Sequence, residues 1–232
     1  MFGPKRAKHI FKNSLSIVIE NTELPKLDKA KTLGIVLDTD LRFEDFINCN
    51  IGKGYSILKT LYSNRHCLPR KTKAMLCDSL ILSLLNYADV LYGPCLTSLY
   101  KGKIQKLQNS CLRFIYGIRR GQRISYKLKE AGWLSMADRR YLHAACMFHS
   151  IILSKTPLYL HRKISFRTDV HNVNIRSKGL LTTPVHKTEL FKRSFRYQIG
   201  KVYNGLKREL QGCSVMLFRL KLKKILLLRQ TF

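Results

Sequence analysis

A change in the spacing of apolar residues near Phe46 constrains the fold of this chain more than any other feature. Before it, two short runs rich in β-branched residues, 15–19 and 33–37, indicate strands. After it, apolar residues recur at helical spacing over about 46–69, 71–91, 103–116, 135–153, 189–210 and 215–227. The sequence therefore predicts a mainly α fold with a small N-terminal β-hairpin.

Local signals mark the ends of several predicted helices. Ser135 and Asp138 have the spacing of a capping box, and Gly117 and Pro157 mark helix ends. The helix over 71–91 carries one apolar stripe at helical spacing, made of Met75, Leu76, Leu80, Leu84, Tyr87 and Leu91. These signals divide the chain into a strand-bearing segment 1–48, a helical domain 49–160, an irregular, extended or mobile link 161–187, and basic C-terminal helices 188–232.

Positive charge is the second constraint, with 43 Lys and Arg against 14 Asp and Glu and a formal net charge of +29. The excess lies in residues 46–232, which hold 35 basic and 7 acidic side chains, against 8 and 7 in residues 1–45. Because phosphate neutralisation releases counterions, a long basic surface favours nucleic acid as the partner. A basic ribosomal-type or membrane-surface protein is the alternative.

Other site signals are weak. The seven cysteines include no Cys-x-x-Cys pair, so the sequence indicates neither a disulfide framework nor a zinc ribbon. His143 and His149 are interpreted as packing or boundary residues and not as metal ligands, and Asp38-x-Asp40 as a polar turn after a strand. Trp133 and the aromatic residues at helical spacing are interpreted as core residues and not as base-stacking surfaces. No small-molecule substrate is predicted.

Short blocks occur in a fixed order over residues 31–227, namely 33–38, 41–47, 87–93, 104–115, 132–134, 139–140, 182–184, 187–188, 194–195 and 203–204. Together they resemble the end of the palm and the thumb-like region of non-LTR retrotransposon reverse transcriptases of the LINE-type, jockey-like kind. Tyr92 and Tyr203 stand where that family often has tryptophan. The resemblance implies a truncated palm edge within 1–48, followed by a helical thumb-like bundle.

For an intact member of that family, the resemblance implies RNA-directed DNA synthesis with Mg²⁺. The aspartate-bearing motifs of the palm and fingers are not found in this sequence. Tyr87-Ala88-Asp89 is followed by Val90, where a tyrosine-x-Asp-Asp motif has its second aspartate. We therefore expect no catalytic residue, no cofactor and no metal site in this chain.

Two functional hypotheses and a neutral one follow. In the first, the chain is a reverse-transcriptase fragment that binds template–primer nucleic acid without reading its sequence and without polymerising. Its candidate phosphate-binding residues are Lys101, Lys103, Lys106, Arg113, Arg119, Arg120 and Arg123. In the second, a stand-alone module binds RNA, RNA–DNA hybrid or DNA through Arg193, Arg196, Lys201, Lys207 and Arg208. In the third, the chain is a transposon relic with no selected activity.

The sequence also carries expectations about location. We expect an intracellular protein of the nucleus or cytoplasm, because its start lacks the apolar run of a signal peptide. The most apolar run, 75–85, is too short to cross a bilayer. The basic run 219–229 is interpreted as the solvated face of an amphipathic helix, with nucleic-acid contact or membrane-surface binding as the alternatives. The oligomeric state is not predicted.

Overall fold

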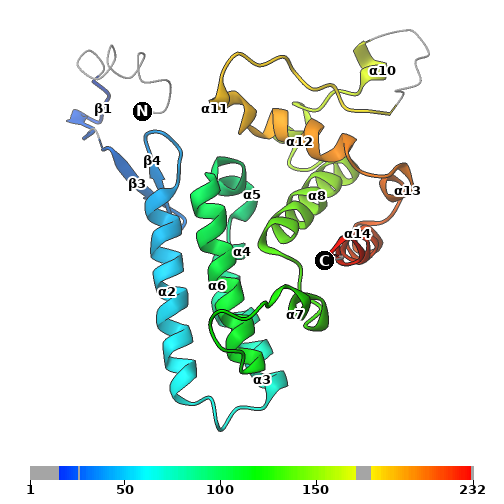
Figure 1. Cartoon of the computed structure of the whole chain (residues 1–232). Helices are drawn as coiled ribbons and strands as arrows, with labels where there is room; N and C mark the ends of the chain where they lie inside the picture. Colours follow the sequence, from blue (N-terminus) through cyan, green and yellow to red (C-terminus); the bar gives the residue numbers. More distant parts are fainter. Residues whose placement is uncertain (1–15, 26, 171–178, 231–232) are drawn as a thin grey trace.

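The computed structural model describes residues 16–25, 27–170 and 179–230, and this part of the chain is mainly helical (Figure 1). Two small antiparallel hairpins precede the helices. The first pairs β1 (Val18–Ile19) with β2 (Thr22–Glu23), and the second pairs β3 (Lys29–Thr32) with β4 (Ile35–Asp38). The predicted mainly α fold with N-terminal β-hairpin structure is confirmed at this level.

The strand partners differ from those that the sequence suggested. The runs 15–19 and 33–37 do not pair with each other, because each folds back on its immediate neighbour. In the second hairpin, Leu33 and Gly34 form the two-residue turn, with φ of 49° and 79°. Positive φ at both turn residues matches the right-handed twist of the flanking strands. The Leu-Gly step is therefore a turn and not the start of a strand.

The helices follow in the order expected, with more breaks. They are α2 (Glu44–Ser63), α3 (Arg70–Leu76), the π-helix η1 (Cys77–Leu82), α4 (Ser83–Asn86), α5 (Asp89–Tyr92), the 3₁₀ turn η2 (Gly93–Cys95), α6 (Ser98–Tyr116), α7 (Ser125–Glu130), α8 (Met136–Ser154), α9 (Leu158–His161), α10 (Arg167–Val170), α11 (Glu189–Lys192), α12 (Phe195–Asn204), α13 (Arg208–Gln211) and α14 (Val215–Arg229). In Figure 1, α2 and α6 lie side by side, and α8, α12 and α14 form a second group beside them.

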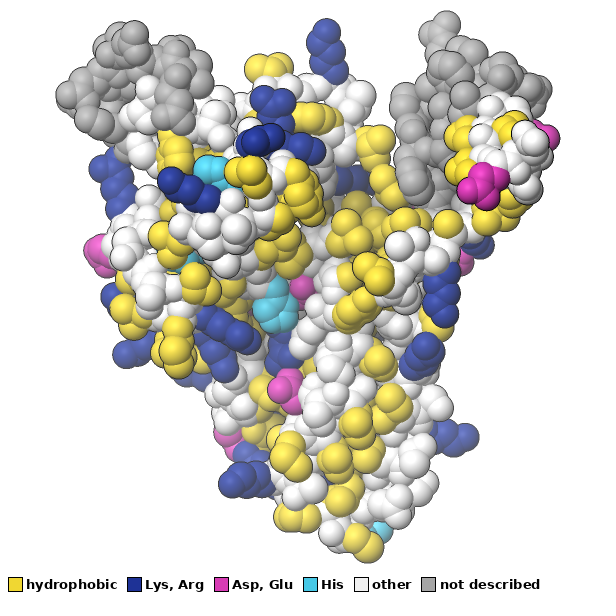
Figure 2. Space-filling view, turned by 180° about the vertical axis from the view of Figure 1, so that it is seen from behind, with side chains coloured by type: hydrophobic (Ala, Val, Ile, Leu, Met, Phe, Trp, Pro, Cys, Tyr) yellow, Lys and Arg dark blue, Asp and Glu magenta, His cyan; other side chains and the backbone are white. Residues whose placement is uncertain are grey.

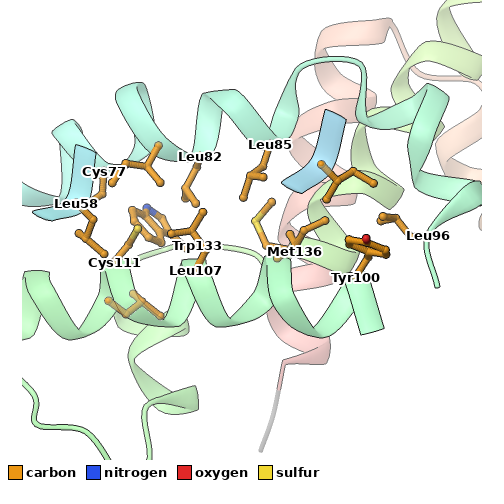
Figure 3. Close-up of a cluster of buried hydrophobic side chains, with 14 of the residues drawn as sticks. Leu58, Cys77, Leu82, Leu85, Leu96, Tyr100, Leu107, Cys111, Trp133 and Met136 are labelled. Atoms are coloured by element: carbon orange, nitrogen blue, oxygen red, sulfur yellow. The ribbon is translucent and has the colours of Figure 1, made fainter. Parts of the chain in front are cut away.

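A first hydrophobic core lies between α2, η1 and α6. Leu107 and Cys111 of α6 and Leu82 of η1 are fully buried. Figure 3 shows Trp133, from the segment before α8, among these three side chains. The same core takes in Phe46 and Leu58 of α2 and Met136 at the start of α8. Its apolar area is the main source of stability for this half of the molecule.

A second core lies between α8, α12 and α14. Leu142 and Phe148 of α8 pack with Ile199 of α12 and with Phe218 and Leu222 of α14, and all five are buried. The helix α8 therefore belongs to both cores. The helix 215–227 of the sequence analysis is confirmed as α14, whereas the helix 189–210 is three shorter helices, α11, α12 and α13.

Polar contacts join the two cores. Gln108 Nε2 of α6 donates to the carbonyl oxygen of Leu134 at 2.9 Å, and the N–H of Met136 donates to Gln105 Oε1 at 3.0 Å. Because Gln108 is fully buried, its hydrogen bond offsets the cost of removing its amide from water. These bonds fix the start of α8 against α6.

Local hydrogen bonds and one glycine explain where several helices begin and end. Ser135 Oγ accepts the N–H of Asp138 at 3.1 Å, which confirms the predicted cap of α8. Gly117 has φ 67° and ends α6, as a glycine after a helix often does. The carboxylate of Asp38 accepts the backbone N–H groups of Asp40, Arg42 and Phe43, as the polar-turn interpretation predicts.

The helix predicted over 71–91 is interrupted. A π-helical stretch, η1, lies in its middle, and the helix breaks at Ala88, which has φ 56°. Its sequence-predicted stripe is not the buried face, because the buried apolar side chains are Cys77, Ile81, Leu82 and Leu85. The outer stripe, as we call it, consists of Met75, Leu80, Tyr87 and Leu91, which are 62%, 44%, 50% and 50% exposed. Figure 2, seen from behind, shows hydrophobic side chains on the surface, including several in the lower half of the molecule.

Within the predicted link 161–187, residues 171–178 lie outside the described part of the chain. The described part of the link contains α10 and a bridge between Phe166 and Leu181, and Leu181 is buried in the second core. Among the described residues, no single helix is long and apolar enough to cross a membrane. The bent pair Arg70–Asn86 and Asp89–Cys95, at 49°, meets the length and composition requirement only when taken together.

Candidate nucleic-acid interface

A hollow of about 660 Å³ opens where α2 and α6 end, and we call it the first hollow. Its walls come from the second half of α2, from α3, from the last turns of α6 and from the connector after α6. The lining side chains are mostly basic or aromatic, and none is acidic. They are Tyr55, Leu58, Lys59, Tyr62, Arg65, Lys73, Ser110, Arg113, Phe114, Gly117, Ile118, Arg119 and Arg120.

Helical spacing brings the α2 residues that line the first hollow onto one face of the helix. Tyr55, Lys59 and Tyr62 are four and three residues apart, so one face of the helix presents them in a row. Tyr55 and Tyr62 are 41% and 39% exposed, while Leu58, between them in the sequence, is buried in the first core. The core interpretation of the aromatic residues is confirmed for Trp133 and wrong for these two tyrosines.

The opposite wall depends on the end of α6. Phe114 is buried, and its ring lies 4.9 Å from that of Tyr62 with a tilt of 60°. After Phe114 the left-handed Gly117 turns the chain out of the helix. This turn places Arg119 and Arg120 on the rim of the hollow beside Arg113.

The positive charge of the first hollow is not balanced by any acidic side chain that the structure describes in its lining. Six of its lining residues are Lys or Arg, and none of them forms an ion pair with a described carboxylate. Arg113 Nε is buried without a hydrogen-bond partner. Burial raises the pKa of the Tyr62 hydroxyl, and the nearby charges of Arg113 and Arg120 oppose that rise. A concentration of unpaired cations in a partly enclosed space attracts anions.

The structure brings together only part of the set of phosphate-binding residues predicted for a reverse-transcriptase fragment. Lys103, Lys106 and Arg113 lie three and seven residues apart and share one face of α6, about 15 Å long at ~1.5 Å per residue. The Lys103 ammonium lies 4.9 Å from the centre of the Tyr100 ring. Lys101 lies two residues before Lys103, on another face of the helix. Arg123 is exposed on the connector and does not line the hollow.

A second hollow, of about 490 Å³, lies between the segment after α9 and the start of α12. Its lining is also basic and aromatic and includes no acidic side chain. The residues are Arg162, Lys163, Ile164, Ser165, Phe191, Ser194, Phe195 and Arg196. Ser194 Oγ is buried without a hydrogen-bond partner.

The predicted C-terminal residues do not form one site. Arg196 lines the second hollow, whereas Lys201, Lys207 and Arg208 are exposed on α12 and around the start of α13. Arg193 is half-buried near Cys95. Burial raises the pKa of the Cys95 thiol, and the charge of Arg193 opposes that rise. On the face drawn in Figure 2, Lys and Arg side chains are spread over the surface and Asp and Glu are sparse.

Several lining residues were not predicted from the sequence. Lys59, Arg65 and Lys73 line the first hollow, and Arg162 and Lys163 line the second. The spacing of Tyr55, Lys59 and Tyr62 on one helix face was a usable signal. No comparable signal exists for Lys73, because only the packing of α3 against α6 brings it there.

Two histidines of α8, the half-buried His143 and the buried His149, serve packing. His143 Nδ1 lies 2.5 Å from Oδ2 of the buried Asp89, which ties α8 to α5. The fully buried His149 stacks on Phe218 at 4.1 Å, and its Nε2 lies 2.8 Å from the carbonyl oxygen of Cys213. Both residues thus take part in packing, as predicted.

The described residues do not fit a two-metal polymerase centre. No group of three His, Cys, Asp or Glu side chains among them gathers to hold a metal ion. The Asp38 carboxylate accepts backbone hydrogen bonds, and Asp89 faces His143. Comparisons with protein families, with curated proteins and with solved structures find no match for this chain.

Proposed function

We propose that this chain binds the phosphate backbone of nucleic acid without reading its sequence, and that it does not polymerise. The first hollow is the observation that supports this function best. It gathers Lys59, Arg65, Lys73, Arg113, Arg119 and Arg120 around one opening with no lining carboxylate. Each phosphate that such a cation neutralises releases condensed counterions, which makes binding favourable at low salt.

The α6 face extends the same surface. Lys103 and Lys106 continue from Arg113 toward the start of the helix. A polyanion longer than one nucleotide can therefore contact the hollow and the helix together. Phosphate contacts of this kind position a nucleic acid but carry no sequence information.

The resemblance gives this binding a context. In it, the chain is a fragment of a non-LTR retrotransposon reverse transcriptase, with residues 49–160 as the thumb-like part and residues 1–48 as the palm remnant. The natural ligand would then be template–primer, either RNA–DNA hybrid or duplex. The resemblance implies magnesium only for an intact family enzyme.

The second hollow favours an alternative function. Arg162, Lys163 and Arg196 would form the main contact if the chain acts as a stand-alone RNA- or DNA-binding module. Binding would then depend on the C-terminal half and not on α2 and α6. The relic hypothesis predicts no specific dependence on either hollow.

The test is binding of the purified chain to fluorescent RNA, RNA–DNA hybrid and duplex DNA over a salt series, with primer extension in parallel. The variant Arg119→Gln/Arg120→Gln removes two exposed cations of the first hollow. We expect weaker binding to every nucleic acid. The slope of the logarithm of the binding constant against the logarithm of the salt concentration should become shallower by about 1–2, at ~0.7–0.9 per lost phosphate contact. We expect no primer extension.

The control is Lys53→Gln/Lys129→Gln, which removes the same charge from exposed sites outside both hollows. Equal loss in both double variants would reduce the effect to net charge and overturn the role of the first hollow. Loss only in Arg162→Gln/Arg196→Gln would favour the C-terminal module. Absence of binding at low salt would exclude both nucleic-acid functions, and primer extension would show that the chain polymerises.

A further inference from the structure

We propose that the first hollow takes an unpaired nucleotide of single-stranded RNA or DNA, with the base stacked on Tyr62 and the flanking phosphates held by Arg113, Arg119 and Arg120. This inference rests on the proposed function and names the strand state that the site selects. It differs from the template–primer expectation, because it makes the bound base unpaired.

The environment of Tyr62 supports a stacking role. The ring is braced by the buried Phe114 at 4.9 Å, yet 39% of the residue is exposed at the wall of the hollow. A ring that is fixed on one side and open on the other offers a flat surface at little cost in side-chain entropy. Tyr55, two helical turns earlier, adds a second exposed ring on the same wall.

The cations line the same hollow as the ring on which the base would stack. Arg113 and Arg120 line the same hollow as Tyr62, and their charges oppose the rise that burial causes in the pKa of the Tyr62 hydroxyl. The Lys73 ammonium, which lines the same hollow, lies 5.4 Å from the centre of the Phe114 ring. Base-stacking rings surrounded by cations are the combination that binds single strands without sequence preference.

Duplexes cannot use both features. In a duplex the base faces are covered by neighbouring bases, so a ring on the protein has no face to stack on unless a base leaves the helix. A volume of about 660 Å³ is that of a small-molecule pocket, which suits one nucleotide. Both single strands and duplexes can contact the cations on the rim through their phosphates, whereas only a single strand can stack a base on Tyr62.

The experiment compares Tyr62→Leu with the unchanged chain on matched single-stranded and duplex oligonucleotides of equal length. Leucine keeps an apolar contact with Phe114 but removes the stacking face. Tyr159→Leu is the control, because Tyr159 is 66% exposed on α9 and lines neither hollow. Trp133 fluorescence in both variants checks that the first core is intact.

We expect Tyr62→Leu to weaken single-strand binding about tenfold or more while changing duplex binding less than about twofold, and Tyr159→Leu to change neither. If Tyr62→Leu leaves single-strand affinity unchanged, or weakens both strand states equally, the inference is overturned although the chain still binds nucleic acid. Absence of binding by the unchanged chain would instead overturn the proposed function. Tyr55→Leu repeats the comparison at the second ring, with a smaller loss expected.

Discussion

At the scale of single residues, Gly54 shows how closely α2 approaches the first core. A Cβ atom at this position would lie 2.6 Å from Leu107 Cδ2 and 3.3 Å from Ile81 Cγ2. Both neighbours are fully buried, so neither side chain has free space to move into. At Gly52, on the same helix, a Cβ atom would meet nothing within 4 Å.

We expect Gly54→Ala to be less stable than Gly52→Ala by about 1–3 kcal/mol, the usual cost of an added methyl group in a packed core. Because both glycines lie inside α2, the gain from the higher helix propensity of alanine cancels in the comparison. Urea unfolding followed by circular dichroism measures the difference. Equal stability of the two variants would show that the core accommodates the methyl group.

Residue patterns predicted local structure better than they predicted exposure. The Ser135 cap, the turn around Asp38 and the end of α6 at Gly117 follow from rules that act over a few residues. Whether Tyr62 faces core or solvent depends on how α2 packs against α6. Apolar spacing on α2 includes both Leu58 and Tyr62, and only the tertiary contact separates the buried residue from the exposed one.

At the scale of elements, the start of α8 depends on one hydroxyl. Ser135 Oγ accepts the N–H of Asp138 and donates to its Oδ2 at 2.7 Å, and Gln230 Nε2 donates to the same carboxylate oxygen at 3.0 Å. Ser135→Ala removes the cap and leaves a helix N–H without its acceptor. We expect a loss of about 1 kcal/mol in the free energy of unfolding.

The matched variant is Ser135→Thr, which keeps a hydroxyl at the cap and should recover most of the stability. Ser56→Ala, at an exposed position inside α2, should cost nothing, because alanine is the better helix former. Thermal unfolding of the three variants gives the ranking. If threonine does no better than alanine at position 135, the cap does not contribute.

The helix over 71–91 shows where element prediction stops. Its sequence has apolar residues on more than one side, so helical spacing alone does not decide which side is buried. Packing against α2 and α6 selects Ile81, Leu82 and Leu85, and the π-helical stretch shifts the register of the residues after Cys77. The outer stripe lies on the face of the helix that this packing leaves exposed.

At the scale of the whole molecule, α8 joins the two cores, so we expect them to unfold as one cooperative unit. It supplies Met136 to the first core and Leu142 and Phe148 to the second. Loss of the second core would free α8 and break the buried bond from Gln108 to Leu134. Trp133, the single tryptophan, lies in the first core and reports on it separately.

We expect Phe218→Ala, in the second core, to lower the free energy of unfolding by about 3–5 kcal/mol, because it opens a cavity in a fully buried site. The midpoint of Trp133 fluorescence and that of far-ultraviolet circular dichroism should fall together. Leu220→Ala, 59% exposed on the same helix, should change both by little. Two separate transitions would show that the cores unfold independently.

Only some features of the whole molecule could be predicted from the sequence. The mainly helical architecture and the basic surface follow from apolar spacing and composition, which can be read from the linear sequence. The first hollow combines Lys59, Lys73 and Arg120 from three separate segments. Such a gathering depends on the angles at which helices pack, and these angles are not encoded by any short pattern.

The outer stripe has a consequence for how the protein behaves in solution. Four large apolar side chains lie exposed on a molecule whose formal charge is +29, so mutual repulsion keeps the stripes of different copies apart. Salt shortens the reach of that repulsion to about 3 Å at 1 M. The free protein should therefore lose solubility in the same high-salt solutions that strip polyanions from it.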